Sequence, residues 1–537
     1  MRHQRAWTLF AIAGIACLGA APSGAQAPAG DIGWPSYNRT LLSDRYAPLD
    51  EINTANVGKL REVCTYDLGI VSEFEPGPIV IGRVLYATSE MDIFAIDADT
   101  CKEIWRTHED IPVPGRHFPT NRGAAYLDGK LFRGTQDARV FAYDAATGKK
   151  LWETKILETK GETIPAAPIA WNGMVFVGNA GGDIKGVKGR MYALDAQTGK
   201  IVWETYLVPD QGRAKTKSGT ENVTASTWKN KTNVPITGGA TWSSYTIDTV
   251  TGLLYIPGGN PAPDFNNKVR PGDNLFAGSV VVLDAKTGKY KRHYPLVPRD
   301  FHDWDVSATP ALFTSKSGRL EMAIAGKNGL LYGYDLATHK RMFATPVTTR
   351  KNTTAPFSAK GTEFCPGASG GAEWNGPAYS PDTNLIYTGE ADWCSIVTLE
   401  EEEETVAAEE GQSWTGAIKA APFGDHTKGP WAGWLMATDA ETGKVKWKYK
   451  AEGPVLSGVT PTKGGLVFAG DMNGNAFAFD AATGKILWQT KFDGAPGAGV
   501  VTYTVGGHQR VAMVSGTNTF VFPLSPKGSA KIHIFGM

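Results

Sequence analysis

Three loop segments carry residues that could bind a metal ion and perform acid–base chemistry. One is a glycine-rich stretch that ends in Asp183, a second contains Asn260, and a third contains Asp305. Carboxylate and amide oxygens are hard ligands that suit Ca²⁺, and a carboxylate can also act as a base. Together these residues predict a metal site with a base beside it.

An indole that could stack on a flat ligand lies in the same part of the chain, at Trp242. Each candidate also has a plain structural interpretation. Asp183 could cap a turn, Trp242 could be one more core residue, and Asn260 before a proline is an ordinary turn former. The combination, rather than any single residue, therefore indicates a ligand site.

The elements that must position these loops are repeats of about a dozen residues. Alternating apolar residues before an Asp predict a half-buried strand, and Asp-x-x-Thr-Gly predicts a tight turn. A Lys and a final Trp then begin a second strand. Four clear copies lie at 141–152, 192–203, 436–447 and 477–488, and three variants lie at 94–105, 281–292 and 332–343.

The spacing of the repeats predicts an all-β protein, an eight-bladed β-propeller. Several intervals are about 40 to 50 residues, the length of one four-stranded blade. Seven copies are visible, and we expect an eighth blade to form when the first mature strand pairs with the last, near 521–523. Seven blades are the alternative. The repeated Trp residues should dock between blades, and residues 26–537 should form one domain.

The N-terminus predicts a secretory signal peptide over residues 1–25. Arg2 and Arg5 precede an uncharged, mostly apolar run, and Ala25 ends a small-x-small cleavage site. A lipid anchor at Cys17 is the alternative. The style of the signal favours a bacterial periplasm. No later segment is long and apolar enough to span a membrane, and the balance of 54 basic and 54 acidic residues gives no indication of nucleic-acid binding.

Four cysteines remain after the predicted cleavage, and an even number in an oxidising compartment suggests disulfides. We expect Cys365 to pair with Cys394 on the functional face, and Cys64 to pair with Cys101 within the first blade. The sequence alone leaves the other pairings open. No Cys-x-x-Cys-His motif occurs, so we expect no covalent haem.

The chain resembles the quinoprotein alcohol dehydrogenases, which bind pyrroloquinoline quinone (PQQ) in an eight-bladed propeller. The resemblance extends over nearly the whole mature chain. Its most specific motifs are GGNPAPDFN at 258–266, HDWDVSATP at 302–310 and GKNGLLYGYD at 326–335.

The resemblance implies a role for each candidate. Asp183 and Asn260 would ligate Ca²⁺, and Asp305 would be both a ligand and the catalytic base. Asp305 would take the hydroxyl proton of an alcohol while hydride passes to PQQ, with Ca²⁺ as Lewis acid, giving an aldehyde or ketone. The implied cofactor-binding residues are Glu75, Arg122, Gly181, Gly182, Trp242 and Lys327. A separate carrier, such as a soluble cytochrome c, would accept the electrons.

The chain departs from the family pattern at several positions. Arg116 and His117 stand where many members have two adjacent cysteines over the quinone, a change compatible with bulky or secondary alcohols. Asp183 replaces a Glu, and Pro165 replaces a hydroxyl residue. Ser307 stands where lanthanide-using relatives have Asp, which favours calcium.

Two other functions fit the propeller pattern. A non-catalytic scaffold of the outer-membrane assembly type would share the repeat, although it would not be expected to carry Trp242, Asn260 and Asp305. A propeller hydrolase or lyase would use the channel carboxylates with a metal.

Overall fold

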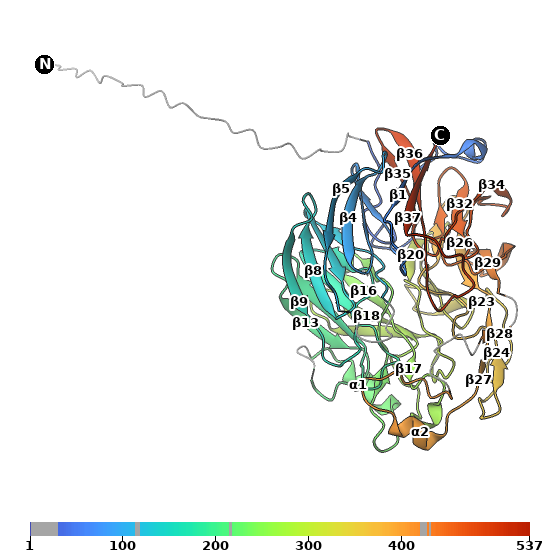
Figure 1. The fold of residues 1–537 in the computed structure, drawn as a ribbon. Coiled ribbons are helices and arrows are strands. Elements are labelled where there is room, and N and C mark those ends of the chain that lie inside the picture. The colour runs from blue at the N-terminus through green and yellow to red at the C-terminus, as the bar shows by residue number, and fades with distance from the viewer. Residues whose placement is uncertain (2–29, 113–118, 214–216, 419–426, 429–430) are drawn as a thin grey trace.

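The repeats form the blades of a propeller. A computed structural model describes the chain apart from residues 2–29, 113–118, 214–216, 419–426 and 429–430, so the expected signal peptide lies, from residue 2 on, outside the described residues. Within the described part, eight four-stranded antiparallel sheets follow one another around the molecule (Figure 1). The predicted eight-bladed architecture is confirmed.

The strands of each blade follow one another along the chain, except in the last blade. The first blade contains β2 (Ile79–Ile81), β3 (Val84–Thr88), β4 (Asp92–Asp97) and β5 (Glu103–His108), and the second contains β6 (Ala125–Leu127), β7 (Lys130–Gly134), β8 (Arg139–Asp144) and β9 (Lys150–Lys155). The third contains β10 (Ile169–Trp171), β11 (Met174–Gly178), β12 (Arg190–Asp195) and β13 (Ile201–Tyr206). The fourth contains β15 (Thr246–Asp248), β16 (Leu253–Pro257), β18 (Ser279–Asp284) and β19 (Tyr290–Pro295). The next three are β20 (Ala311–Thr314), β21 (Leu320–Ala325), β22 (Leu330–Asp335) and β23 (Arg341–Pro346); β25 (Ala378–Ser380), β26 (Leu385–Ala391), β29 (Gly433–Asp439) and β30 (Val445–Ala451); and β31 (Thr460–Pro461), β32 (Leu466–Gly470), β33 (Asn475–Asp480) and β34 (Ile486–Lys491).

Each repeat supplies the third and fourth strands of a blade and the turn between them. In the copy formed by β8 and β9, Asp144 Oδ1 accepts hydrogen bonds from the backbone N–H of Thr147 at 2.9 Å and from its hydroxyl at 2.7 Å. The Asp and Thr of the motif therefore close the turn, as their types predict.

The Trp that ends a repeat docks onto the next blade, as expected. Trp203 is buried, and its Nε1 donates to the carbonyl of Ala285, the residue after the repeat Asp of the following blade, at 2.9 Å. The same bond type is made by Trp105 to Ala145, Trp152 to Ala196, Trp447 to Ala481 and Trp488 to Leu60. In five of the seven repeats, an indole thus fixes the contact between neighbouring sheets.

Apolar side chains between facing sheets form the core. One cluster joins Phe176 of β11 and Trp203 of β13 to Leu254 of β16 and Val281 of β18. Each sheet buries both faces against its neighbours, so no blade has a core of its own.

The eighth blade is closed by strands from opposite ends of the propeller sequence. It contains β35 (Val500–Val505), β36 (His508–Ser515), β37 (Lys531–Gly536) and, as its outer strand, β1 (Arg61–Asp67), with Thr65 opposite His533. The expected closing strand near 521–523 was wrong, because Val521 and Phe522 line a central cavity instead. The repeat motif is missing from this blade because its third and fourth strands come from opposite ends of the chain.

A disulfide strengthens this closure. Cys64 in β1 is bonded to Cys101 in the turn between β4 and β5. The pairing was predicted correctly, but its place was not, since the bridge joins the closing blade to the adjacent blade rather than lying within one. Cys101 replaces the turn glycine of its repeat and has the positive φ of 58° that this turn requires.

The loops that carry the candidate residues emerge at one end of the propeller. In a meander of antiparallel strands, connections after the second and fourth strands lie at the same end. Asp183 and Lys327 follow second strands, and Arg122 and Asp305 follow fourth strands. The repeat turns lie at the other end.

Small elements decorate these loops. At one end of the molecule lie α1 (Glu221–Thr224), β17 (Pro261–Ala262) and α2 (Glu402–Ala407), as Figure 1 shows. The others are η1 (Val57–Lys59), η2 (Ala225–Thr227), η3 (Asn267–Val269), β14 (Thr237–Gly238), β24 (Thr362–Phe364), β27 (Cys394–Val397) and β28 (Thr427–Lys428). Among the described residues, no helix has the length and apolar character needed to cross a bilayer.

Candidate cofactor and metal site

A cavity of about 830 Å³ lies where these loops converge. All of the predicted catalytic, metal-ligating and cofactor-binding residues line it, namely Glu75, Arg122, Gly181, Gly182, Asp183, Trp242, Asn260, Asp305 and Lys327. They come from loops of different blades, so only the closed ring brings them together.

Carboxylates crowd one part of this cavity. Oxygen atoms of Asp183, Asp264 and Asp303 lie within 4.8 Å of one another. The Asn260 side chain joins them, since its Nδ2 donates to Asp264 Oδ1 at 2.8 Å. An all-oxygen set of this kind fits a hard cation such as Ca²⁺.

The electrostatics of the cluster also favour a bound cation. Burial raises the pKa of Asp183 to about 6, and the Asp305 carboxylate contributes to the rise. Burial, with the nearby Asp183, also raises the pKa of Asp264 well above its usual range. Burial raises the pKa of Asp303 in the same way, although Lys327 opposes it. A bound cation would relieve this repulsion.

Asp305 is held by two donors from different loops. Its Oδ1 accepts a hydrogen bond from the backbone N–H of Asn260 at 2.8 Å, and its Oδ2 lies 2.7 Å from Lys327 Nζ. The carboxylate is only 3 % exposed and still lines the cavity. Its position is therefore set, while the cavity gives a ligand access to it.

Lys327 links the acidic cluster to the aromatic part of the cavity. Burial alone would lower its pKa, but the carboxylates of Asp303 and Asp305 raise that pKa well above the usual value, so the side chain is an ammonium. Its Nζ lies 5.5 Å from the ring centroid of Trp242. A cation therefore stands between the acids and the indole.

Trp242 and Arg122 form the second half of the site. Trp242 is half-buried, and the Arg122 guanidinium lies 4.9 Å from its ring centroid and 4.9 Å from that of Trp374. Arg122 also donates to the Trp242 carbonyl at 3.0 Å and pairs with Glu75 at 2.7 Å. An indole with an ordered guanidinium beside it fits a flat ligand that carries carboxylates.

Glu75 lies in the most buried part of this group. Burial raises its pKa to about 8, with Glu73 and Glu373 adding to the rise and Arg122 opposing it. Glu75 and Arg122 thus hold each other in place at the cavity wall.

Gly181 has a conformational role beyond the one inferred from its type. Its φ is +98°, and a Cβ at this position would lie 2.6 Å from the Gly161 carbonyl oxygen. A Cβ at Gly182 would lie 3.2 Å from Ala240 Cβ. The two glycines therefore allow the loop before Asp183 to pack closely against its neighbours.

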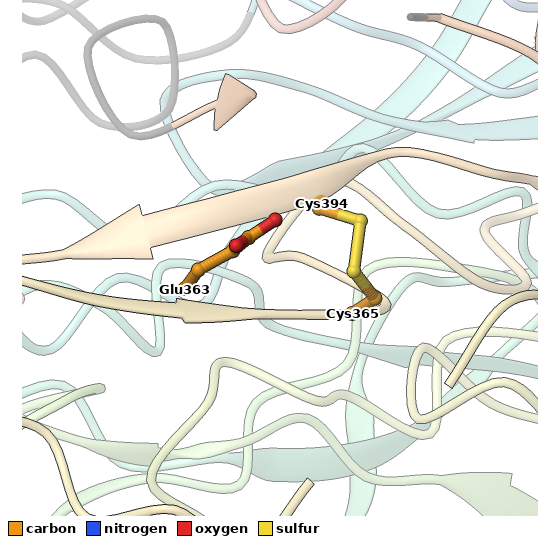
Figure 2. Close-up of side chains that lie close together, drawn as sticks. All are labelled: Glu363, Cys365 and Cys394. Atoms are coloured by element: carbon orange, nitrogen blue, oxygen red, sulfur yellow. A yellow bond between two sulfur atoms is a disulfide. The ribbon is translucent and has the colours of Figure 1, made fainter. Parts of the chain in front are cut away.

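The second predicted disulfide, Cys365–Cys394, is present and joins the end of β24 to β27. Figure 2 shows it beside Glu363, and a carboxylate oxygen of Glu363 lies within 4.8 Å of both sulfurs. Both sulfurs are committed to the disulfide, so they cannot act as thiolate ligands. The bridge instead anchors the segment that leads to Ala368 and Ser369 in the cavity wall.

The residues that depart from the family pattern lie in different surroundings. Pro165 lines the cavity. Ser307 is buried, and its hydroxyl donates to the Ala372 carbonyl at 2.7 Å, so it serves the loop backbone. Arg116 and His117 lie outside the described residues.

Sequence reasoning missed four residues of the site. Asp264 and Asp303 lie inside the motifs that carry the resemblance, and their acidic type was the available signal. Glu373 and Trp374 also line the cavity or contact its residues, but no local pattern distinguishes them.

Comparisons with known proteins match this architecture. The family model for the β-propeller domain of PQQ-linked glucose/ethanol/alcohol dehydrogenases matches residues 34–353 and 336–511. The dehydrogenase subunit of the alcohol dehydrogenase (quinone) of Gluconobacter oxydans is 33% identical over 544 residues, which cover 90% of this chain and 70% of the relative.

Two solved structures superpose closely on the propeller. The quinohemoprotein alcohol dehydrogenase from Comamonas testosteroni has a TM-score of 0.83 at 27% identity, over 94% of this chain and 80% of that one. A europium-containing methanol dehydrogenase has a TM-score of 0.82 at 27% identity, over 94% and 98% of the two chains.

Proposed function

The chain belongs to the family of PQQ-dependent glucose, ethanol and alcohol dehydrogenases, and on this basis we propose that its cavity binds PQQ and a hard cation and oxidises an alcohol to an aldehyde or ketone. One observation carries the proposal. The aromatic and cationic group around Trp242 and the acidic cluster around Asp183 line the same cavity. A scaffold would not need this pairing, so that alternative is not retained.

The cation proposed for the acidic cluster is Ca²⁺, with Asp183, Asn260 and Asp305 as ligands. Their oxygen atoms are the hard donors that calcium prefers, and calcium tolerates irregular ligand geometry. The shorter side chain of Asp183, where relatives of this type have Glu, is therefore compatible with the ion.

The cofactor would lie against Trp242, with Arg122 pairing with a carboxylate. When bound, PQQ supplies the acceptor for the hydride of the alcohol, and the cation supplies Lewis acidity. Lys327 provides a hydrogen-bond donor between the indole and the acids. Glu75 orients Arg122 toward the cavity.

Asp305 is the proposed base. Its Oδ1 and Oδ2 are oriented by the Asn260 N–H and the Lys327 ammonium. From this position the carboxylate takes the proton of the alcohol hydroxyl, which frees the carbinol carbon to lose its hydride. The proton resides on Asp305 until the product leaves.

The cellular setting and the electron acceptor complete the proposal. The charged start and apolar run of the N-terminus, together with two disulfides, support export to the periplasm. A separate carrier, such as a soluble cytochrome c, would reoxidise the cofactor, since the sequence has no haem-attachment motif.

The test is reconstitution of the purified apoprotein with PQQ and Ca²⁺, followed by alcohol-dependent dye reduction. We expect activity only with both additions, loss of activity with a chelator, and recovery with Ca²⁺. Asp305→Asn should reduce turnover at least about 10²-fold because it removes the base. The absorbance of the variant should show that PQQ is still bound.

Asp471→Asn is the matched control, because Asp471 is fully buried and does not line the cavity. It should retain activity. Dye reduction by metal-free, PQQ-free protein, or normal turnover by Asp305→Asn, would contradict the proposal.

A further inference from the structure

One oxygen of the Asp264 carboxylate has no hydrogen-bond partner among the described residues. The residue is fully buried, and it lines the cavity beside Asn260. Its Oδ1 accepts the 2.8 Å hydrogen bond from Asn260 Nδ2, whereas its buried Oδ2 accepts no hydrogen bond from the described residues. An unpaired buried carboxylate oxygen is costly unless it has a cationic partner.

Asp264 is also held rigidly. The buried Arg270 donates from Nε to the Pro263 carbonyl at 3.0 Å and from Nη2 to the Asp264 carbonyl at 3.1 Å. Arg270 therefore fixes the backbone next to this side chain, and its hydrogen bonds go to main-chain and amide oxygens. Asp264 lines the cavity, and none of these Arg270 hydrogen bonds goes to its carboxylate.

The acidic cluster has ligand atoms close enough together to hold a cation at this point. Oxygen atoms of Asp264, Asp183 and Asp303 lie within 4.8 Å of one another. Asp303 is drawn toward Lys327, 3.5 Å away, and Asp305 toward the same ammonium at 2.7 Å. Asp264 has no comparable cationic contact in the described part of the chain within 4.0 Å.

We propose that Asp264 is a further ligand of the metal ion, beside Asp183 and Asn260, an inference that rests on the proposed function. Asp264 lies four residues after Asn260 and on the same loop, so one rigid segment presents an amide and a carboxylate to the ion. Its carboxylate oxygen would compensate for the side chain of Asp183, which is shorter than the Glu of the family pattern. The added negative charge favours ions of higher charge.

The first test measures metal binding. The full-length protein is freed of metal and titrated with Ca²⁺ and, separately, with Tb³⁺, with and without PQQ. Asp264→Asn keeps an oxygen that can accept from Asn260 but loses the charge. We expect it to weaken Ca²⁺ binding at least about tenfold and Tb³⁺ binding by a larger factor, because affinity follows the charge of the ligands.

The second test uses thermal unfolding and needs no activity. Without metal, Asp264→Asn should unfold at a higher temperature than the natural protein, because the substitution removes one of several repelling carboxylates. With saturating Ca²⁺, the rise in unfolding temperature should be smaller in the variant than in the natural protein.

Two variants serve as comparisons. Asp471→Asn, which changes a buried carboxylate that does not line the cavity, should leave Ca²⁺ affinity unchanged. Asp303→Asn should weaken Ca²⁺ binding less than Asp264→Asn, because Asp303 is paired with Lys327.

Unchanged Ca²⁺ affinity in Asp264→Asn would overturn the inference, as would a lower unfolding temperature of its metal-free form with an unchanged response to Ca²⁺. Absence of metal binding by the natural protein would instead overturn the proposed function.

Discussion

At the residue scale, burial of carboxyl groups is pronounced outside the acidic cluster of the cavity as well. Glu390, in β26, is fully buried. Burial raises its pKa well above the usual range, Glu373 adds to the rise, and the Thr388 hydroxyl opposes it. The folded protein therefore favours the protonated form of Glu390 far more than the unfolded chain does.

This preference predicts a pH-dependent stability. Because the pKa of Glu390 is raised on folding, its contribution is fully present below the unfolded pKa of about 4.3 and is lost as the pH rises through the folded pKa. Glu390→Gln has no such titration. We expect the unfolding temperature of the variant, relative to the natural protein, to increase as the pH rises from acidic to alkaline values.

Thermal unfolding across this pH range checks the prediction. Glu452→Gln, at an exposed position, should follow the natural protein at every pH. A constant difference between Glu390→Gln and the natural protein would show that Glu390 does not titrate on unfolding.

At the element scale, the turn of each repeat does more than reverse the chain. Gly288, with φ +67°, lies against Trp203 of the preceding blade, and a Cβ would approach its indole to 2.7 Å. The Thr205 hydroxyl donates to the Gly288 carbonyl at 2.7 Å. The glycine of the motif thus permits both the turn and the docking of the Trp, which the repeat pattern alone does not reveal.

Gly288→Ala should therefore be more damaging than an ordinary turn substitution. Gly129 has φ +75° with open space around its Cβ position, so Gly129→Ala should cost about 1–2 kcal/mol from backbone strain alone. At Gly288 the clash with the indole should add about 1–3 kcal/mol. Unfolding temperatures of the two variants give the comparison, and equal losses would refute docking through this glycine.

At the scale of the whole molecule, the ring is held closed by β1 on β37 and by the Cys64–Cys101 disulfide. The pairing joins segments more than 400 residues apart along the chain. The disulfide ties β1 to the turn between β4 and β5 of the adjacent blade. The cavity is lined by residues of many blades, so opening of the ring would disperse the site.

Loss of this disulfide should weaken closure. In Cys64→Ala/Cys101→Gly, the second change restores the usual turn glycine, so only the covalent link is lost. We expect a destabilisation of about 2–4 kcal/mol, seen as a lower unfolding temperature, and faster proteolysis near 61–67. The natural protein under reducing conditions should move toward the variant. Equal protease resistance in oxidised protein and variant would contradict this role.

The sequence by itself determined the blades and most of the site. The Asp-x-x-Thr-Gly turn and the Trp are local chemistry repeated along the chain, so their strands and docking could be predicted. Asp183, Asn260, Trp242 and Asp305 stood out because their types suit a ligand, and all of them line the cavity.

Only the tertiary structure decided which segments meet. The partner of β1, the blades that Cys64 and Cys101 connect, and the position of Asp264 among the other acids depend on how eight sheets close into a ring. Local sequence cannot specify these contacts, because packing between distant segments is set by the shape of the whole ring. A carboxylate's neighbours, and hence its charge and its ability to bind a cation, are decided by that closure.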